Sequence, residues 1–286
     1  MSTPRVAAVH DLSAFGRCSL TIVIPTLSAM GVQCCPLLTA YLSTHTGGFM
    51  GNTFLDLTDQ IRPVARHWRS EGITFDAVYT GFMGSEEQIG LTASFIRDFR
   101  RPGCRVVIDP VMGDNGKPYR TYTPRMCRAM ADLAALADVI TPNPTEAALL
   151  LGERCDDLDL TGEQACRRIC GELSRNGSRS VVLTGVSLAE NTIGAVCFDR
   201  ETGQVEFAAA GLVPGAFHGT GDLFASVLTG ALVRGWPLVK AAQLASEFTS
   251  QCAQRTLAEA APRREGVSFE PLLWRLGQQM EAQSHG

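Results

Sequence analysis

The 286-residue sequence has few charged side chains, and neither sign of charge dominates it. Aspartate, glutamate, lysine and arginine make up 19% of the residues, the formal net charge is −4, and no cluster of lysine and arginine stands out. Because nucleic-acid binding needs a basic surface, this composition argues against a nucleic-acid partner and favours small-molecule partners.

The spacings of a metal or disulfide framework are also missing, although the chain has ten cysteines. Cys34 and Cys35 are adjacent, Cys166 and Cys170 lie one helical turn apart, and no pair has the C-x₂-C spacing of a zinc site. We therefore expect most cysteines to be small buried hydrophobic residues in a reducing, cytoplasmic environment.

The N-terminus lacks the layout of a signal peptide. Residues 18–55 contain no Asp, Glu, Lys or Arg, a composition that is also found in membrane spans. Pro25, Gly31 and the pair Gly47-Gly48 interrupt this segment, however, and hydroxyl side chains are scattered through it. A buried strand-and-helix unit explains the segment better, so we expect no contact with a membrane.

Three common active-site motifs are absent as well. No G-x-G-x-x-G follows the first predicted strand, no serine lies in G-x-S-x-G, and Lys117 follows Gly116 without the remaining spacing of a Walker loop. These absences argue against a dinucleotide-binding enzyme, a P-loop enzyme and an α/β-hydrolase.

Short apolar runs alternate with helical patterns along the whole chain. The patterns predict strands at 5–10, 32–40, 76–81, 105–110, 138–143 and 179–185, and a hairpin of 194–198 with 205–210. Helices are predicted near 19–31, 54–69, 86–100, 124–137, 145–151, 161–175, 220–234, 237–259 and 270–281. This alternation implies one α/β domain over residues 1–286, with a mostly parallel sheet covered on both faces.

Polar residues gather where the predicted strands end. In folds of this class, ligands bind at the carboxyl ends of the strands. The residues at those ends are His10-Asp11, Thr39 before STHTGG, Gly81-Phe82, Asp109, Thr141 and Thr184-Gly185.

The segment FHGTGDLFASVLTGALVRGWP (217–237) joins a glycine-rich turn to a long apolar helix. Thr220 is the predicted N-cap, and Asp222 falls in the first turn, where a carboxylate complements the helix dipole. A first-turn acid needs no glycines, whereas Gly219 and Gly221 allow the backbone to approach a ligand closely. The unpaired N–H groups of such a turn form a ready anion site.

Two further motifs carry acidic residues. In DPVMGDNG, Asp109 ends a strand and Asp114 follows Gly113, an arrangement that suits Mg²⁺ bound together with phosphates. A simple turn explains Asp114 equally well. In TPNPTE, Asn143 and Glu146 have the spacing of a capping box, although Glu146 could also reach metal-bound water.

These motifs, in the order HDLSAFGRCSLT, STHTGG, YTGFMGS, DPVMGD, TPN..E and GTGDLFASVL, resemble the ribokinase superfamily and, within it, the pyridoxal kinases. The resemblance covers most of the chain. It implies a ribokinase-like three-layer α/β/α sandwich and an ATP-dependent kinase for the 5′-hydroxymethyl group of vitamin B6 vitamers, namely pyridoxal, pyridoxamine and pyridoxine. It also implies a homodimer, with residues 18–55 as a candidate interface, and Mg²⁺ as a cofactor, and it leaves a K⁺ requirement open.

The resemblance also implies roles for individual residues. Asp222 would be the general base that accepts the substrate hydroxyl proton, and the N–H groups of Gly219, Thr220 and Gly221 would bind the transferred phosphoryl group. Asp109, Asp114 and Glu146 would hold Mg²⁺. The expected ATP contacts are Asp109, Asp114, Tyr122 on a flap over residues 115–122, Thr141, Asn143, Glu146, Thr184 and Thr220. The expected substrate contacts are His10, Asp11, Ser13, His45, Thr46, Phe82 and Asp222.

The sequence departs from the pyridoxal kinase pattern at two places. Phe82 stands where many relatives have tyrosine, so a ring contact is kept and a hydroxyl is lost. HDLSAFG stands where they have a Ser-His pair, and Asp11 or Ser13 would replace a ring-facing hydroxyl, which leaves the preferred vitamer open. The sister family of hydroxymethylpyrimidine kinases usually has cysteine at the position of Asp222, which favours a vitamin B6 kinase here. A hydroxymethylpyrimidine kinase and a non-catalytic vitamer-binding regulatory protein remain the alternatives.

Overall fold

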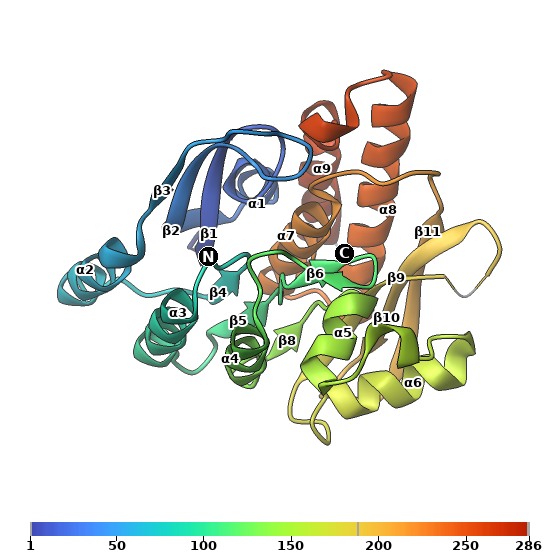
Figure 1. Ribbon diagram of the computed structural model, residues 1–286, viewed down its shortest axis with the longest axis horizontal. Helices are drawn as coiled ribbons and strands as arrows, with labels where there is room; N and C mark the ends of the chain where they lie inside the picture. The colour runs from blue at the N-terminus through green and yellow to red at the C-terminus, as the bar shows by residue number, and fades with distance from the viewer. Residues whose placement is uncertain (1, 188, 285–286) are drawn as a thin grey trace.

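The computed structural model describes residues 2–187 and 189–284. Its centre is a nine-stranded sheet with the order β11-β10-β9-β8-β5-β4-β1-β2-β3 (Figure 1). The strands are β1 (Arg5–Phe15), β2 (Gln33–Thr44), β3 (Phe54–Asp56), β4 (Ala77–Thr80), β5 (Arg105–Ile108), β8 (Val139–Ile140), β9 (Ser180–Val186), β10 (Thr192–Phe198) and β11 (Val205–Gly211). A separate small hairpin is formed by β6 (Gly113–Asp114) and β7 (Lys117–Pro118).

The six central strands are parallel, from β9 through β8, β5, β4 and β1 to β2. Only the edges are antiparallel, where β10 and β11 form the predicted hairpin and β3 pairs with β2. Apolar runs such as Val106–Ile108 are wholly buried, as expected for strands covered on both faces. The predicted mostly parallel sheet is therefore confirmed.

Helices cover both faces of the sheet and complete three layers. One face carries α1 (Leu20–Ala29), α7 (Thr220–Val233), α8 (Leu238–Ala258) and α9 (Leu273–Ser284), which share one apolar core with it. The other face carries α2 (Thr58–Ser70), α3 (Glu86–Phe99), α4 (Pro124–Ala134), α5 (Pro144–Leu151) and α6 (Gly162–Leu173), which share a second core. None of the described helices has the length and apolar character that a membrane crossing needs.

The first two strands are longer than predicted. β1 continues to Phe15 and β2 to Thr44, past the level at which β4 ends, and the pairing register between them shifts near His10. We call residues 11–15, 41–44 and 54–56 the arm. The predicted helix near 54–69 is wrong at its start, because residues 54–56 pair with β2 and the helix begins at Thr58.

The start of α7 also differs from the prediction in one detail. Gly219, and not Thr220, is the N-cap, with a positive φ of 81°. The hydroxyl of Thr220 donates instead to the carbonyl of Phe217 at 3.1 Å, so it closes the preceding turn. Gly235, with a φ of 85°, follows the last turn of the helix, where glycine is favoured. The helix therefore begins without a side-chain cap, so no capping side chain accepts a hydrogen bond from its first N–H groups.

A substitution at Phe75 tests the packing of the second core, between the sheet and helices α2 to α6. Phe75 is fully buried before β4 and makes ring contacts with Trp68, Phe95 and Phe99. We expect Phe75→Ala to lower the free energy of unfolding by about 3–5 kcal/mol, because the ring leaves a cavity that the sheet cannot fill. Urea unfolding measures this change. Leu257→Ala, at a side chain that is 49% exposed, should change it by less than about 0.5 kcal/mol, and equal effects of both would contradict the packing described.

Candidate active site

The candidate site lies at the carboxyl edge of the sheet. Gly81 follows β4, Asp109 follows β5 and Thr141 follows β8, so the structure brings the three predicted strand ends together. The N-terminus of α7 reaches the same region, because Asp222 interacts electrostatically with Asp109.

Asp222 is held through one of its two carboxylate oxygens. Its Oδ2 accepts hydrogen bonds from the backbone N–H of Ser19 at 2.9 Å and from the thiol of Cys18 at 3.4 Å. Its Oδ1 accepts no hydrogen bond from any described residue. Burial raises the pKa of Asp222 from 3.8 to about 6, while the Ser19 bond opposes that rise. Asp222 is thus an oriented carboxylate with one oxygen available.

Asp109 is a second buried carboxylate, only 6% exposed. Its Oδ1 accepts a hydrogen bond from the hydroxyl of Thr141 at 2.9 Å. Burial, and then the neighbouring charge of Asp222, raise the pKa of Asp109 to about 7. The two acids therefore disfavour each other's ionisation, and a cation or an extra hydrogen-bond donor between them would relieve both.

Glu146 and Asn143 form the predicted capping box of α5. The Glu146 carboxylate accepts from the N–H of Asn143 at 2.9 Å and, through its other oxygen, from the N–H of Met112 at 3.1 Å. Burial raises the pKa of Glu146 well above its ordinary value, and the charge of Asp109 adds to this. Glu146 thus ties the start of α5 to the loop after β5, and both of its oxygens are occupied.

Asp114 lies on the exposed turn of the β6–β7 hairpin. Its carboxylate accepts hydrogen bonds from the backbone and side-chain N–H groups of Asn115. Asn115 and Gly116 both have positive φ, 52° and 76°, so the alternative interpretation of this segment as a turn is correct.

The predicted metal residues do not form a preformed cage. Within residues 2–187 and 189–284, no group of three or more His, Cys, Asp or Glu side chains is arranged to hold a metal ion. Asp109 has one carboxylate oxygen to which no described residue donates, whereas both oxygens of Glu146 and of Asp114 accept hydrogen bonds from the protein. This donor set fits a Mg²⁺ ion that takes one protein carboxylate and otherwise phosphate oxygens and water. The set of Asp109, Asp114 and Glu146 stays a prediction.

The two glycines of the GTGD turn differ in whether the fold requires them. A Cβ on Gly219 would lie 2.3 Å from the carbonyl oxygen of Arg17, so this glycine is required by the fold itself. A Cβ on Gly221 would meet nothing within 4 Å, and the residue is exposed. Internal packing therefore does not explain Gly221, and open space lies where its side chain would be, at the start of α7.

The predicted substrate residues on β1 are deeply buried. The His10 ring is fully buried between Tyr79 and Gly81, and neither ring nitrogen has a hydrogen-bond partner among the described residues. Burial lowers its pKa to about 3. Asp11 is 4% exposed and accepts from the hydroxyls of Ser19, at 2.6 Å, and Ser13, at 3.0 Å. His10 is therefore a neutral ring beneath the site, and both oxygens of Asp11 already have donors.

His45 anchors the STHTGG loop to the segment between α8 and α9. Its Nδ1 accepts from the N–H of Gly47, so Nε2 carries the proton that is donated to the carbonyl of Arg264 at 2.7 Å. Its ring packs against those of Phe49 and His218. Burial lowers the pKa of His45, and the loop leaves its neighbour Thr46 exposed.

The remaining predicted residues lie around the loop ends. Phe82 and Tyr122 form an edge-to-face pair with ring centroids 6.3 Å apart, and the side chain of Tyr122 is buried. Thr184 lies within β9 and donates to the carbonyl of Pro142 at 3.3 Å.

Sequence reasoning missed the contribution of the β1–α1 turn. Cys18 and Ser19 contact Asp222 across more than 200 residues of sequence, and His218 and Arg264 contact His45. The only sign of this contribution in the sequence is the motif HDLSAFGRCSLT, which contains Cys18 and Ser19 together with the predicted residues Asp11 and Ser13.

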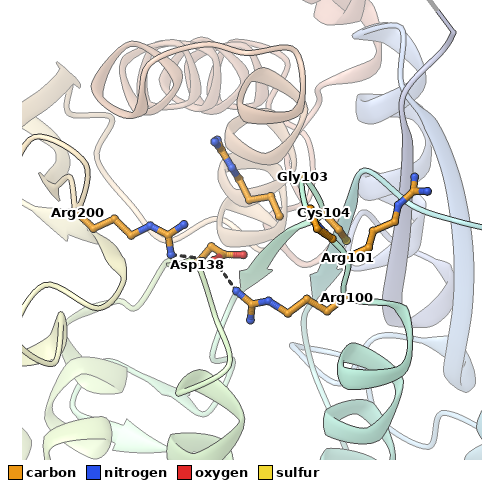
Figure 2. Close-up of a pocket in the computed structure, with 8 residues that line it drawn as sticks. Arg100, Arg101, Gly103, Cys104, Asp138 and Arg200 are labelled. Atoms are coloured by element: carbon orange, nitrogen blue, oxygen red, sulfur yellow. Dashed lines mark hydrogen bonds and ion pairs between the residues drawn. The ribbon is translucent and has the colours of Figure 1, made fainter.

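A cavity of about 500 Å³ lies at the opposite, amino edge of the sheet. Figure 2 shows Arg100 and Arg200 reaching Asp138 from two sides, while Arg101 points away from them. Asp138 also accepts from the N–H of Val106, so it ties α3, β5, β8 and the β10–β11 turn together. This cavity is separate from the carboxylates at the other edge and is not the candidate active site.

The raised pKa of Asp222 predicts a pH-dependent change in stability. The pKa of Asp222 is about 6 in the folded protein and 3.8 in the unfolded chain. Below about pH 4 the group is protonated in both states, and its contribution to stability is at its highest. As the pH rises through 6 this contribution is lost, because the folded protein must then bury the charge. We expect Asp222→Asn to raise the free energy of unfolding by about 1–2 kcal/mol at pH 8 and to leave it unchanged at pH 4. Urea unfolding at the two pH values measures this. Asp132→Asn, at an exposed position of α4, is the control, and the same gain at both pH values would contradict the electrostatic cause.

Known proteins match this chain over most of its length. A protein of Bacteroides thetaiotaomicron, described as a candidate phosphomethylpyrimidine kinase in a crystal form with pyridoxal, is 39% identical, with a TM-score of 0.90 and 96% of each chain covered. The pyridoxal kinase of Lactobacillus plantarum is 32% identical, with a TM-score of 0.88, 99% of this chain and 98% of that chain covered. These structures share the α/β architecture described above, which confirms the predicted ribokinase-like fold.

Sequence comparison leads to thiamine biosynthesis as well. A chloroplast protein of Oryza sativa subsp. japonica, named as a thiamine biosynthetic bifunctional enzyme, is 24% identical over 251 residues. The alignment covers 87% of this chain but 44% of that protein, so the chain spans less than half of its length. The family described as phosphomethylpyrimidine kinase matches residues 24–263. The chain therefore belongs to this kinase family, together with relatives that are named pyridoxal kinases.

Proposed function

We propose that this protein transfers the γ-phosphoryl group of ATP to the 5′-hydroxymethyl group of a vitamin B6 vitamer. One observation carries the proposal: Asp222 has one oxygen fixed by the β1–α1 turn and the other free, at a helix start whose glycine leaves open space. An oriented carboxylate next to an anion-binding turn is suited to a primary alcohol that attacks a phosphoryl group, because it can accept the hydroxyl proton.

In the proposed reaction, the free Oδ1 of Asp222 accepts the hydroxyl proton while the alcohol oxygen bonds to the γ-phosphorus. The bond from that phosphorus to the bridging oxygen breaks, and ADP leaves with the electron pair. The N–H groups of Gly219, Thr220 and Gly221 stabilise the charge on the transferred group. A bound Mg²⁺ would neutralise phosphate charge beside Asp109. Because the pKa of Asp222 is about 6, the base is largely ionised at neutral pH.

The nucleotide is proposed to lie along the ends of β5, β8 and β9. Asp109, Thr141 and Thr184 line that side, and Asn143 with Glu146 fixes the loop beside them. The β6–β7 hairpin and Tyr122 would cover the phosphates. The amide of Asn143 supports this arrangement, because it donates to the carbonyl of Gly113 at 2.9 Å and so connects the hairpin to α5.

The vitamer is proposed to bind between the arm and α7. Phe82 offers an aromatic ring, and the STHTGG loop, held by His45, closes the other side with Thr46 exposed at its surface. Asp11, Ser13 and His10 lie beneath and shape this pocket. The Bacteroides relative, described in a crystal form with pyridoxal, supports a vitamer as the ligand.

Hydroxymethylpyrimidine kinase is the second candidate function. The family description and the thiamine-related relative favour it, and its substrate is also a primary alcohol on a flat nitrogen heterocycle. Asp222 favours the vitamin B6 assignment, because hydroxymethylpyrimidine kinases usually have cysteine at that position. A non-catalytic vitamer-binding protein is a third candidate.

ATP consumption with Mg²⁺ separates these candidates. We expect turnover with at least one of pyridoxal, pyridoxine and pyridoxamine, and a loss of about 10²–10⁴-fold in kcat in Asp222→Asn, since the variant cannot accept a proton. Asp132→Asn should keep the wild-type rate. Turnover with hydroxymethylpyrimidine alone would assign the protein to the second function. Binding of vitamer and ATP without turnover of any alcohol would establish the non-catalytic alternative.

The uncharged segment 18–55 is proposed to form a homodimer interface. Large apolar side chains are exposed on the arm and its surroundings: Phe15 at 52%, Met50 at 98%, Phe54 at 53% and Leu55 at 57%. We expect the protein to elute as a dimer at micromolar concentration in gel filtration with light scattering, and Phe54→Asp to shift it toward monomer, because a charge would be buried at the interface. A wild-type monomer would contradict this.

A further inference from the structure

Ser19 has a backbone conformation that is costly for any residue with a side chain. Its φ is 50° and its ψ is −130°, a combination that glycine adopts readily and that costs a residue with a Cβ roughly 1–3 kcal/mol. The residue is 3% exposed, and it also forms an isolated antiparallel bridge with Leu12 of β1. Something in the surroundings must hold it in this conformation.

Two hydrogen bonds to two different carboxylates hold Ser19. Its N–H donates to Oδ2 of Asp222 at 2.9 Å, and its hydroxyl donates to Oδ1 of Asp11 at 2.6 Å. Asp11 and Asp222 raise each other's cost of ionisation, because the charge of Asp11 raises the pKa of Asp222. Ser19 therefore lies between two acids that repel each other, and it binds both.

The strained conformation gives the N–H its direction. Ser19 is the N-cap of α1, so its N–H would otherwise be one of the unpaired donors of a helix start. The positive φ aims this donor at the carboxylate on the first turn of α7. Two helix N-termini thus converge on Asp222, and both favour its charged form.

We propose that Ser19 is a positioning residue for Asp222: its strained backbone fixes one carboxylate oxygen so that the other faces the substrate hydroxyl, and its side chain locks that strain by binding Asp11. This inference rests on the proposed kinase function. It adds that the β1–α1 turn, which contributes no reacting atom, determines where the general base points.

Ser19→Gly is the sharpest test, because glycine keeps the N–H and tolerates the φ value but loses the lock. We expect a folded variant, with thermal stability equal to or above that of the wild type, whose kcat falls by about ten- to a hundredfold. The KM values for ATP and for the alcohol should stay within about twofold, since Ser19 binds neither substrate. A merely structural serine would not produce a lower kcat in an equally stable protein.

Two further variants serve as comparisons. Ala260→Gly relieves the same positive φ, 50°, at an exposed residue after α8, and should leave kcat unchanged. Ser13→Ala removes the other hydroxyl from Asp11 without touching Asp222, so it reports what the bonding of Asp11 contributes alone. We expect a smaller fall in kcat for Ser13→Ala than for Ser19→Gly.

The outcomes are distinguishable. If the wild type phosphorylates an alcohol and Ser19→Gly keeps its kcat, the positioning role is wrong while the kinase function stands. If Ser13→Ala and Ser19→Gly lose kcat equally, Asp11 rather than the link to Asp222 is responsible, and the positioning role is again wrong. If the wild type phosphorylates no alcohol, both the function and the inference fall.

Discussion

The burial of negative charge at the carboxyl edge of the sheet is the constraint on which the site depends. Asp11, Asp109, Glu146 and Asp222 all lie there, and burial raises the pKa of each. No described Lys or Arg side chain pairs with any of these four in a salt bridge; each is held by neutral N–H, hydroxyl or thiol donors. Such a cluster destabilises the empty protein and attracts a cation, so binding of a metal–nucleotide complex would relieve the repulsion.

The loops at this edge of the sheet pack closely against one another around the buried acids. The carbonyl of Arg17 lies so close to Gly219 that a Cβ there would meet it at 2.3 Å, and the same carbonyl stands 2.5 Å from where a Cβ on Gly266 would lie. The β1–α1 turn is therefore clamped between the start of α7 and the segment before α9. Because the residues that anchor Asp222 lie on this turn, these backbone contacts also support the position of the proposed base.

Much of the fold could be predicted from the sequence, because its signals are local. The alternation of apolar runs and helical patterns predicted the sheet and its two covered faces, and the spacing of Asn143 and Glu146 predicted a capping box that the structure shows. The arm could not be predicted in this way. Residues 54–56 are too few to show a period, and their strand exists only because β2 continues beside them.

The candidate site was predictable as a set of strand ends but not as a set of bonds. Asp222 was identified from its glycines, yet its donors, Ser19 and Cys18, lie more than 200 residues away. The positive φ of Ser19 had no sequence signal either, because serine, unlike glycine, does not indicate one. For Glu146, the sequence predicted the local capping role but not the hydrogen bond that its carboxylate accepts from the N–H of Met112.

The surroundings of Asp222 also bear on why a carboxylate is suited to this position. Cys18 experiences the same environment, because its thiol contacts the Asp222 carboxylate, and burial raises the pKa of that thiol well above its usual 9. A thiol here stays protonated at neutral pH, whereas Asp222, with a pKa of about 6, is largely ionised. Among these neighbours only a carboxylate is a base at neutral pH. The Ser19 N–H, the start of α1 and the helix dipole of α7 offset part of the cost of burying this negative charge, and that charge is what proton removal from an alcohol requires.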